Sequence, residues 1–122
     1  MKIVIKEDGS FQHIPDQLYR FVHNGRELHC DVDSLIADYK GKPAELINVN
    51  EVFKSDSKVD FEYAMKTDTN NPIIIVRFDD GTHEVLDGNH RLFKAVHEGQ
   101  TYIKVHIINE LELNKYDRFR EH

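Results

Sequence analysis

Five consecutive residues, Asp87-Gly88-Asn89-His90-Arg91, place a carboxylate, an imidazole and a guanidinium at the predicted start of a helix. A helix begins with backbone N–H groups that have no intrahelical acceptor, and its dipole is positive there. Gly88 permits close approach of a ligand to the backbone, and the fork of Arg91 can engage two phosphate oxygens. His90 can donate a hydrogen bond or move a proton near neutral pH. The segment therefore predicts a site for a phosphorylated ligand.

An ordinary structural role accounts for part of this pattern. Asp87-Gly88 is a common turn, and aspartate is a good N-cap. Neither role explains His90 next to Arg91, because the dipole disfavours cations in a first helical turn. A bound anion resolves that conflict, provided that the protein's own carboxylates do not occupy the helix start. Asn89 belongs to the same segment, and Lys94 on the polar face of the helix is a further candidate to bind the ligand.

The elements that must position these residues follow from hydrophobic periodicity and turn signals. The helix is predicted over 89–98, closed by Gly99, with an apolar side that must pack on a sheet. A continuous apolar strand over 73–76 and a returning strand over 83–86 precede it. An alternating strand over 101–108 follows it. The resulting strand–turn–strand–helix–strand core predicts an α+β fold with a mixed β-sheet and short flanking helices.

Outside this core the signals are shorter. Asn24-Gly25 is typical of a type I′ turn and predicts a hairpin of strands 18–23 and 27–32. A helix over 34–40 is expected, capped by Asp33 or Ser34. The remaining predictions are strands over 1–6 and 45–53, a helix over 59–66, and a surface helix over 110–120 with Leu111, Leu113, Tyr116 and Phe119 partly buried.

Composition limits the function. The 122 residues suit one domain, and the net charge of −6 argues against a nucleic-acid binder that acts through bulk charge. Residues 87–104 carry +1, which leaves −7 for the remainder and favours a compact phosphorylated ligand over a long polyanion. Cys30 has no partner for a disulfide, and neither a membrane span nor a signal peptide is evident. We therefore expect a soluble, cytoplasmic protein without a membrane partner.

The segment 72–108 resembles the core of the ParB/sulfiredoxin superfamily, whose pattern is a strand, a hairpin, a D-G-x-[HR]-R box opening a helix, and a final strand. Here the box is Asp87-Gly88-Asn89-His90-Arg91, and Ala95 takes the small position in the helix. Leu46-Ile47-Asn48-Val49-Asn50-Glu51-Val52 is similar to the family's first strand. We expect a single domain over 1–122, in which the resemblance assigns a ParB/sulfiredoxin-like core (45–108) between an unassigned extension (1–44) with a β-hairpin and a helical tail (109–122).

The resemblance implies three activities, which the residues separate. Sulfiredoxins carry a catalytic cysteine where Asn89 stands, so sulfiredoxin activity is not expected. Partitioning proteins need further domains after the core, and 14 residues follow Ile108, so a complete partitioning protein is not expected either. Small-molecule kinases of the fold have a similar box and a glutamate base after the first strand, a position matched by Glu51. By that resemblance Glu51, Asp87 and His90 are candidate catalytic residues, and Gly88, Asn89, His90, Arg91 and Lys94 would bind the ligand.

The expected ligand is a nucleotide such as ATP, ADP or CTP, with or without Mg²⁺, or another phosphorylated small molecule. Phosphoryl transfer or nucleotide hydrolysis would be the reaction, with Asp87 positioning substrate or Mg²⁺. Two alternatives stay open. One is a non-catalytic acidic binding module or inhibitor, such as a phage encodes, and the other is a ParB-like DNA-associated protein or nuclease using Asp79, Asp80 and Asp87. The eight histidines show no recognised zinc spacing, so no metal ligands are assigned.

Overall fold

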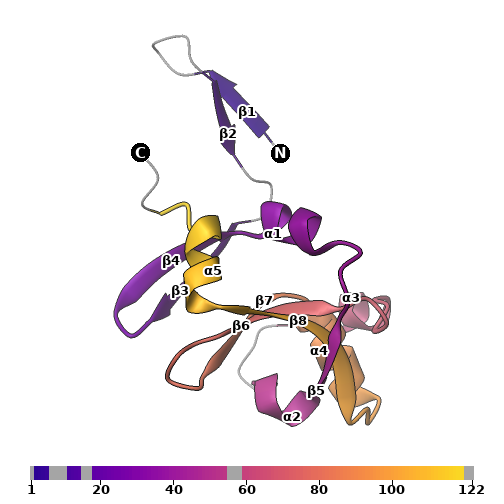
Figure 1. Cartoon of the computed structure of the whole chain (residues 1–122). Helices are drawn as coiled ribbons and strands as arrows, with labels where there is room; N and C mark the ends of the chain where they lie inside the picture. The colour runs from indigo at the N-terminus through magenta and orange to yellow at the C-terminus, as the bar shows by residue number, and fades with distance from the viewer. Residues whose placement is uncertain (1, 6–10, 15–17, 55–58, 120–122) are drawn as a thin grey trace.

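The computed structural model describes residues 2–5, 11–14, 18–54 and 59–119, with side chains described for 18–54 and 59–119 (Figure 1). These residues form strands and short helices, so the predicted α+β class is confirmed. None of the helices in the described ranges has the length and apolar character needed to cross a membrane.

The strands are β1 (Lys2–Ile5), β2 (Phe11–Ile14), β3 (Leu18–His23), β4 (Arg26–Asp31), β5 (Glu45–Asn48), β6 (Ile73–Arg77), β7 (His83–Asp87) and β8 (Tyr102–Asn109). The helices are α1 (Val32–Tyr39), α2 (Val49–Val52), α3 (Phe61–Met65), α4 (Asn89–His97), α5 (Glu110–Leu113) and a 3₁₀ turn, η1 (Asn114–Tyr116).

A four-stranded mixed sheet lies at the centre of the fold, in the order β5-β8-β6-β7. Strands β6 and β8 are parallel, whereas β5–β8 and β6–β7 are antiparallel. The chain passes from β6 through β7 and α4 to β8, which is the predicted strand–turn–strand–helix–strand unit. The β1–β2 and β3–β4 hairpins form separate two-stranded sheets. The mixed sheet expected from the sequence is therefore confirmed, with β5 and β7 at its edges.

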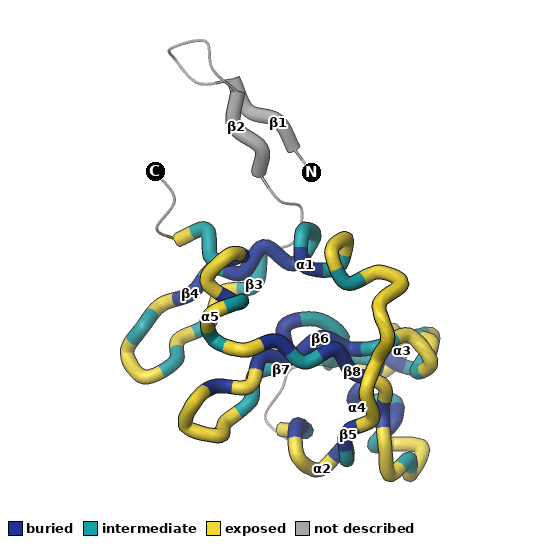
Figure 2. Tube along the Cα trace, in the orientation of Figure 1, coloured by how far each residue is buried: buried dark blue, intermediate teal, exposed yellow. Residues whose placement is uncertain are grey.

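Each face of the sheet supports its own hydrophobic cluster, as the alternation of side chains along a strand requires. Figures 1 and 2 show α1, α5 and the β3–β4 hairpin on one side of the sheet and α2 and α4 on the other. The cluster under α1 and the hairpin contains Leu28, Cys30, Val32, Leu35, Ile74, Val76, Phe78, Leu86, Ile108, Leu113 and Tyr116. The cluster under α2 and α4 contains Ile47, Val49, Val52, Ile73, Ile75, Val85, Leu92, Ala95, Ile103 and Val105.

The segment 18–39, which belongs to the N-terminal extension in the sequence analysis, thus supplies part of the core. Its hairpin turns at Asn24 (φ 50°) and Gly25 (φ 78°), as predicted for a turn that needs positive φ at both positions. Helix α1 begins at Val32 and not at Ser34. The Asp31 carboxylate caps it by accepting from the Ser34 backbone N–H at 3.1 Å, so the predicted caps, Asp33 and Ser34, are wrong.

Two other predicted boundaries are wrong for similar local reasons. The strand predicted over 45–53 ends at Asn48, because the Asn48 side chain accepts from the Asn50 N–H at 2.9 Å and starts α2. The helix predicted over 110–120 ends with η1 at Tyr116. In this tail Leu113 and Tyr116 are buried, whereas Leu111 and Phe119 are exposed and not partly buried as predicted.

After η1 the chain pairs with the hairpin strand β4. The Arg118 N–H donates to the His29 carbonyl at 2.8 Å, and its Nε donates to Asp31 at 3.1 Å. The Asp117 carboxylate accepts from the His29 N–H at 3.1 Å. The tail therefore binds strand β4 of the hairpin through Asp117 and Arg118, and Leu113 and Tyr116 anchor the tail in the core.

Candidate functional site

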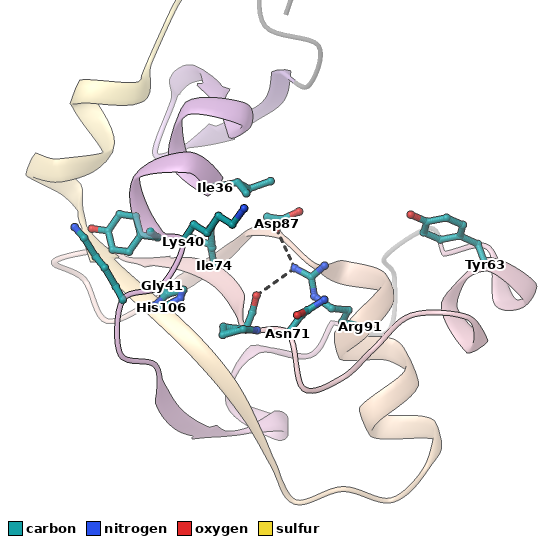
Figure 3. Close-up of a pocket in the computed structure, with 12 residues that line it drawn as sticks. Ile36, Lys40, Gly41, Tyr63, Asn71, Ile74, Asp87, Arg91 and His106 are labelled. Carbon is teal, nitrogen blue, oxygen red and sulfur yellow. Dashed lines mark hydrogen bonds and ion pairs between the residues drawn. The ribbon is translucent and has the colours of Figure 1, made fainter.

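A cavity of about 680 Å³ lies between α1 with the loop that follows it and the β6–β8 part of the sheet; we call it the α1–sheet cavity. Volumes of 300–1,000 Å³ are typical of small-molecule sites. Asp87 and Arg91, from the two ends of the predicted box, line it (Figure 3). Its other walls include Tyr39, Lys40, Lys42, Tyr63, Asn71 and His106.

A β-bulge in β7 turns Asp87 toward this cavity. Ile75 pairs with Val85, but Ile74 pairs with Asp87, so Leu86 is the extra residue. Strict alternation would place Asp87 on the face of Val85, under α4. The bulge places Asp87 on the face of Ile74 instead, where both residues line the cavity.

Asp87 and Arg91 form an ion pair one helical turn apart, with 2.9 Å between Asp87 Oδ2 and Arg91 Nη2. The same Nη2 donates to the Pro72 carbonyl at 3.2 Å, and Figure 3 shows both contacts as dashed lines. Arg91 Nε is buried without a hydrogen-bond partner among the described residues. The protein's own carboxylate thus occupies the helix start and neutralises the guanidinium, so the condition on which the sequence predicts an anion beside Arg91 is not met.

The backbone conformation and the packing at position 88 both require a glycine. Its φ is 106°, a conformation that L side chains rarely adopt. A Cβ at this position would lie 2.5 Å from Ile73 Cγ2 and 3.0 Å from Arg91 Nη2. The glycine therefore lets α4 start directly against β6, and it is not part of the cavity wall.

Three other predicted site residues do not line the cavity. The ring nitrogen Nε2 of His90 accepts from the Asp60 N–H at 3.4 Å, and the ring lies edge-on to Tyr63 with centroids 4.6 Å apart. The Lys94 ammonium donates to the Thr67 carbonyl at 2.7 Å. Asn89 is partly buried and lines no part of the cavity. His90 and Lys94 hold α4 to α3 and to the loop after it, and His90 contacts Tyr63, which lines the cavity.

Glu51 also lies away from the cavity. It is exposed in α2 and close enough to His83 to act on its titration. Burial, assisted by Arg77 and Lys54, lowers the pKa of His83, and the charge of Glu51 opposes this. His83 and Asp87 stand at opposite ends of β7. The structure therefore brings Asp87 and Arg91 together and leaves Glu51 outside their group.

The cations that face the cavity besides Arg91 were missed by the sequence analysis. Lys40 and Lys42 flank Gly41 just after α1, and with Arg91 and Asp87 they give the wall a formal charge of +2 in a chain of −6. A Lys-Gly-Lys sequence at a helix end was the available signal. Figure 3 shows Lys40 on one side of the Asp87–Arg91 pair and Tyr63 on the other.

Aromatic rings complete the wall. The Lys42 ammonium lies 4.5 Å from the ring centroid of Tyr39, a cation–π contact. Burial and a hydrogen bond to Glu112 raise the pKa of Tyr39 to about 12, so its hydroxyl stays protonated at neutral pH. The buried ring of His106 lies 5.5 Å from the Tyr39 ring. Cations beside flat rings are the groups that bind a phosphorylated aromatic ligand.

Comparison of the chain with family models, with curated proteins and with solved structures finds no match.

Proposed function

We propose that this protein binds a phosphorylated small molecule of nucleotide size in the α1–sheet cavity. The observation that carries the proposal is the concentration of Lys40, Lys42 and Arg91 around one cavity of suitable volume in an acidic chain. Electrostatic focusing in a positively charged cleft raises the local concentration of anions. The rings of Tyr39 and Tyr63 offer contacts to a base or another planar group.

In this proposal Asp87 competes with the ligand for Arg91. The side chains of both residues are 20% exposed, so a phosphate can reach the pair. The charge of Asp87 opposes an incoming phosphate, and the orphaned Arg91 Nε leaves the guanidinium incompletely satisfied by the protein. Lys40 and Lys42 supply the initial attraction, and Arg91 adds its fork when the guanidinium turns from the carboxylate to the phosphate.

The finer fold assignment belongs to the same proposal. The box lies between β7 and α4, and β6 and β8 run parallel, which supports a ParB/sulfiredoxin-like fold. Phosphoryl transfer is not included, because Glu51 lies outside the group that Asp87 and Arg91 form. Binding without turnover is the function that the geometry supports best.

A dye-based thermal-shift assay with ATP, ADP, CTP and pyrophosphate, each with and without Mg²⁺, tests the proposal. We expect at least one of these compounds to raise the melting temperature of the full chain, because a ligand that binds only the folded state stabilises it. The double substitution Lys40→Gln/Lys42→Gln should remove that rise. Both lysines are exposed, so their removal should leave the melting temperature without ligand nearly unchanged.

Lys115→Gln is the matched control, because Lys115 is an exposed lysine in η1 outside the cavity wall. It makes the same change of charge and should keep the full ligand response. The proposal is overturned if none of the compounds shifts the melting temperature, which is the result expected of an acidic inhibitor or binding module. It is equally overturned if the double variant responds like Lys115→Gln.

A further inference from the structure

The sheet face that carries the cavity continues beyond it as an exposed row of side chains. Alternate residues of β8 share a face, so Tyr102 and Lys104 lie on the same side as His106 in the cavity wall. Across the strand pair, Leu46 is opposite Lys104 and Asn48 is opposite Tyr102. We call these four residues, Leu46, Asn48, Tyr102 and Lys104, the open strip.

The open strip differs sharply from the rest of this face. Its two large apolar side chains, Leu46 and Tyr102, are 67% and 57% exposed, whereas Ile108, further along the same face of β8, is 1% exposed. Leu46 and Tyr102 are diagonal neighbours across the β5–β8 pair, so they form one exposed apolar group and are not scattered single side chains. The strip therefore has the character of a contact surface.

Charge indicates what the strip contacts. Lys104 is exposed and stands between Tyr102 and His106, and Lys40 and Lys42 follow at the cavity. At a rise of about 3.4 Å per residue, the row from Tyr102 to His106 spans about 14 Å. An aromatic platform in line with several cations is the arrangement that binds single-stranded nucleic acid, where bases stack and lysines neutralise phosphates.

We propose that the open strip and the α1–sheet cavity together bind the phosphorylated end of a short single-stranded nucleic acid. The terminal phosphate enters the cavity, a nearby base stacks on Tyr102, and Lys104 contacts a phosphate between them. This inference rests on the proposed function, since it uses the same cavity for the terminal phosphate. The overall charge of −6 restricts binding to the few nucleotides that these lysines reach, in contrast to bulk-charge binders.

Fluorescence anisotropy with labelled tetrathymidylate tests the inference. The oligomer is used with a 5′-phosphate, with a 3′-phosphate and without a terminal phosphate, the dye being at the opposite end. We expect one phosphorylated form to bind several-fold more tightly than the unphosphorylated form. Tyr102→Ala should weaken that binding about tenfold, since stacking on one aromatic side chain contributes roughly 1–3 kcal/mol per base. Tyr102→Phe keeps the ring and should retain the affinity.

Two further variants sharpen the result. Phe61→Ala removes an aromatic of similar exposure (50%) in α3 and should bind like the unmodified chain. Lys104→Gln should reduce the slope of log affinity against log salt by about 0.7, the value expected for one phosphate of a single strand. If Lys104→Gln leaves the slope unchanged, Lys104 contacts no phosphate and the inference is overturned.

Failure of this inference differs from failure of the cavity proposal. If ATP or pyrophosphate stabilises the protein but a terminal phosphate adds no affinity, or Tyr102→Ala binds like Phe61→Ala, only the inference about the open strip is overturned. If none of the phosphate compounds and none of the oligomers binds, both are overturned.

Discussion

One face of the central sheet has two halves that differ in what lies on them. Over β6 and the C-terminal half of β8, α1, the β3–β4 hairpin and the tail bury residues such as Leu35 and Ile108 completely. Over β5 and the N-terminal half of β8, the same face presents Leu46, Tyr102 and Lys104 as exposed side chains. The α1–sheet cavity lies at the border between these halves.

The difference shows how this small domain separates stability from binding. The covered half places its apolar residues in one cluster with the hairpin, and burial of that kind supplies most of the free energy of folding. The border and the open half carry cations and partly exposed rings instead. Substitutions in the covered half should therefore lower the stability of the protein, whereas substitutions at the border and in the open half should lower its affinity for the ligand.

The largest expected effect compares two leucines on either side of the border. Leu35→Ala should lower the free energy of unfolding by about 3 to 4 kcal/mol, because it leaves a cavity in a fully buried site. Leu46→Ala should change it by less than about 0.5 kcal/mol, because Leu46 is exposed. Urea denaturation followed by far-UV circular dichroism measures both. Equal losses would show that the open half is covered in solution.

A second comparison concerns the glycine of the box. Gly88→Ala should destabilise the protein by about 2 to 3 kcal/mol, since positive φ and contact with Ile73 both oppose a Cβ. Gly81→Ala is the control: its φ is 87°, but nothing lies within 4 Å of its Cβ position, and about 1 kcal/mol is expected. Urea denaturation followed by far-UV circular dichroism measures the loss of stability in both variants. Similar losses for the two variants would mean that packing against β6 is not what requires Gly88.

A third prediction addresses the ion pair at the border. Asp87→Asn should increase the affinity for whichever compound stabilises the protein in the thermal-shift assay by several-fold, because it removes the negative charge next to Arg91. Isothermal titration calorimetry measures the affinity. Asp79→Asn makes the same change of charge in the exposed β6–β7 turn and should have little effect. Unchanged or weaker binding of Asp87→Asn would contradict the competition between Asp87 and the ligand.

The smallest expected effect is a titration at the cavity wall. Tyr39 has its pKa raised to about 12 by burial and by Glu112, so the folded state favours the neutral phenol. The stabilisation is present below pH 10 and is lost as the pH rises from 10 toward 12. Ultraviolet absorbance of the phenolate should show that Tyr39→Phe removes one tyrosine that titrates near pH 12. Loss of a tyrosine that titrates near pH 10 would instead mean that Tyr39 is solvated.

The sequence predicts well the part of the fold whose elements are specified by nearby residues. Strands β6, β7 and β8 and helix α4 follow from apolar runs, turn residues and the glycine after the helix, all within about 40 residues. The helix boundaries fail where a side chain caps unexpectedly. Asp31 and Asn48 each end a strand and start a helix by accepting a hydrogen bond from a backbone N–H of the first helical turn, which composition does not distinguish from a polar strand end.

The candidate site was less predictable because long-range contacts assemble it. Lys40 and Lys42 line the same cavity as Arg91 only because α1 packs on the sheet, and no local pattern links residues so far apart in sequence. The direction of His90 depends on α3, whose Asp60 and Tyr63 contact the ring. Within the box, the sequence pattern did not predict the ion pair of Asp87 and Arg91, because that pair depends on a strand irregularity.

That irregularity makes the charge of the cavity a matter of backbone register. Because Leu86 is the extra residue of β7, Asp87 pairs with Ile74 and its carboxylate lies on the cavity side of the sheet. If the same residues paired in regular register, Asp87 would be opposite Ile73, and its carboxylate would lie on the other side of the sheet, beneath α4. The cavity wall would then keep Lys40, Lys42 and Arg91 without the carboxylate that now offsets one of their charges, although the sequence is unchanged.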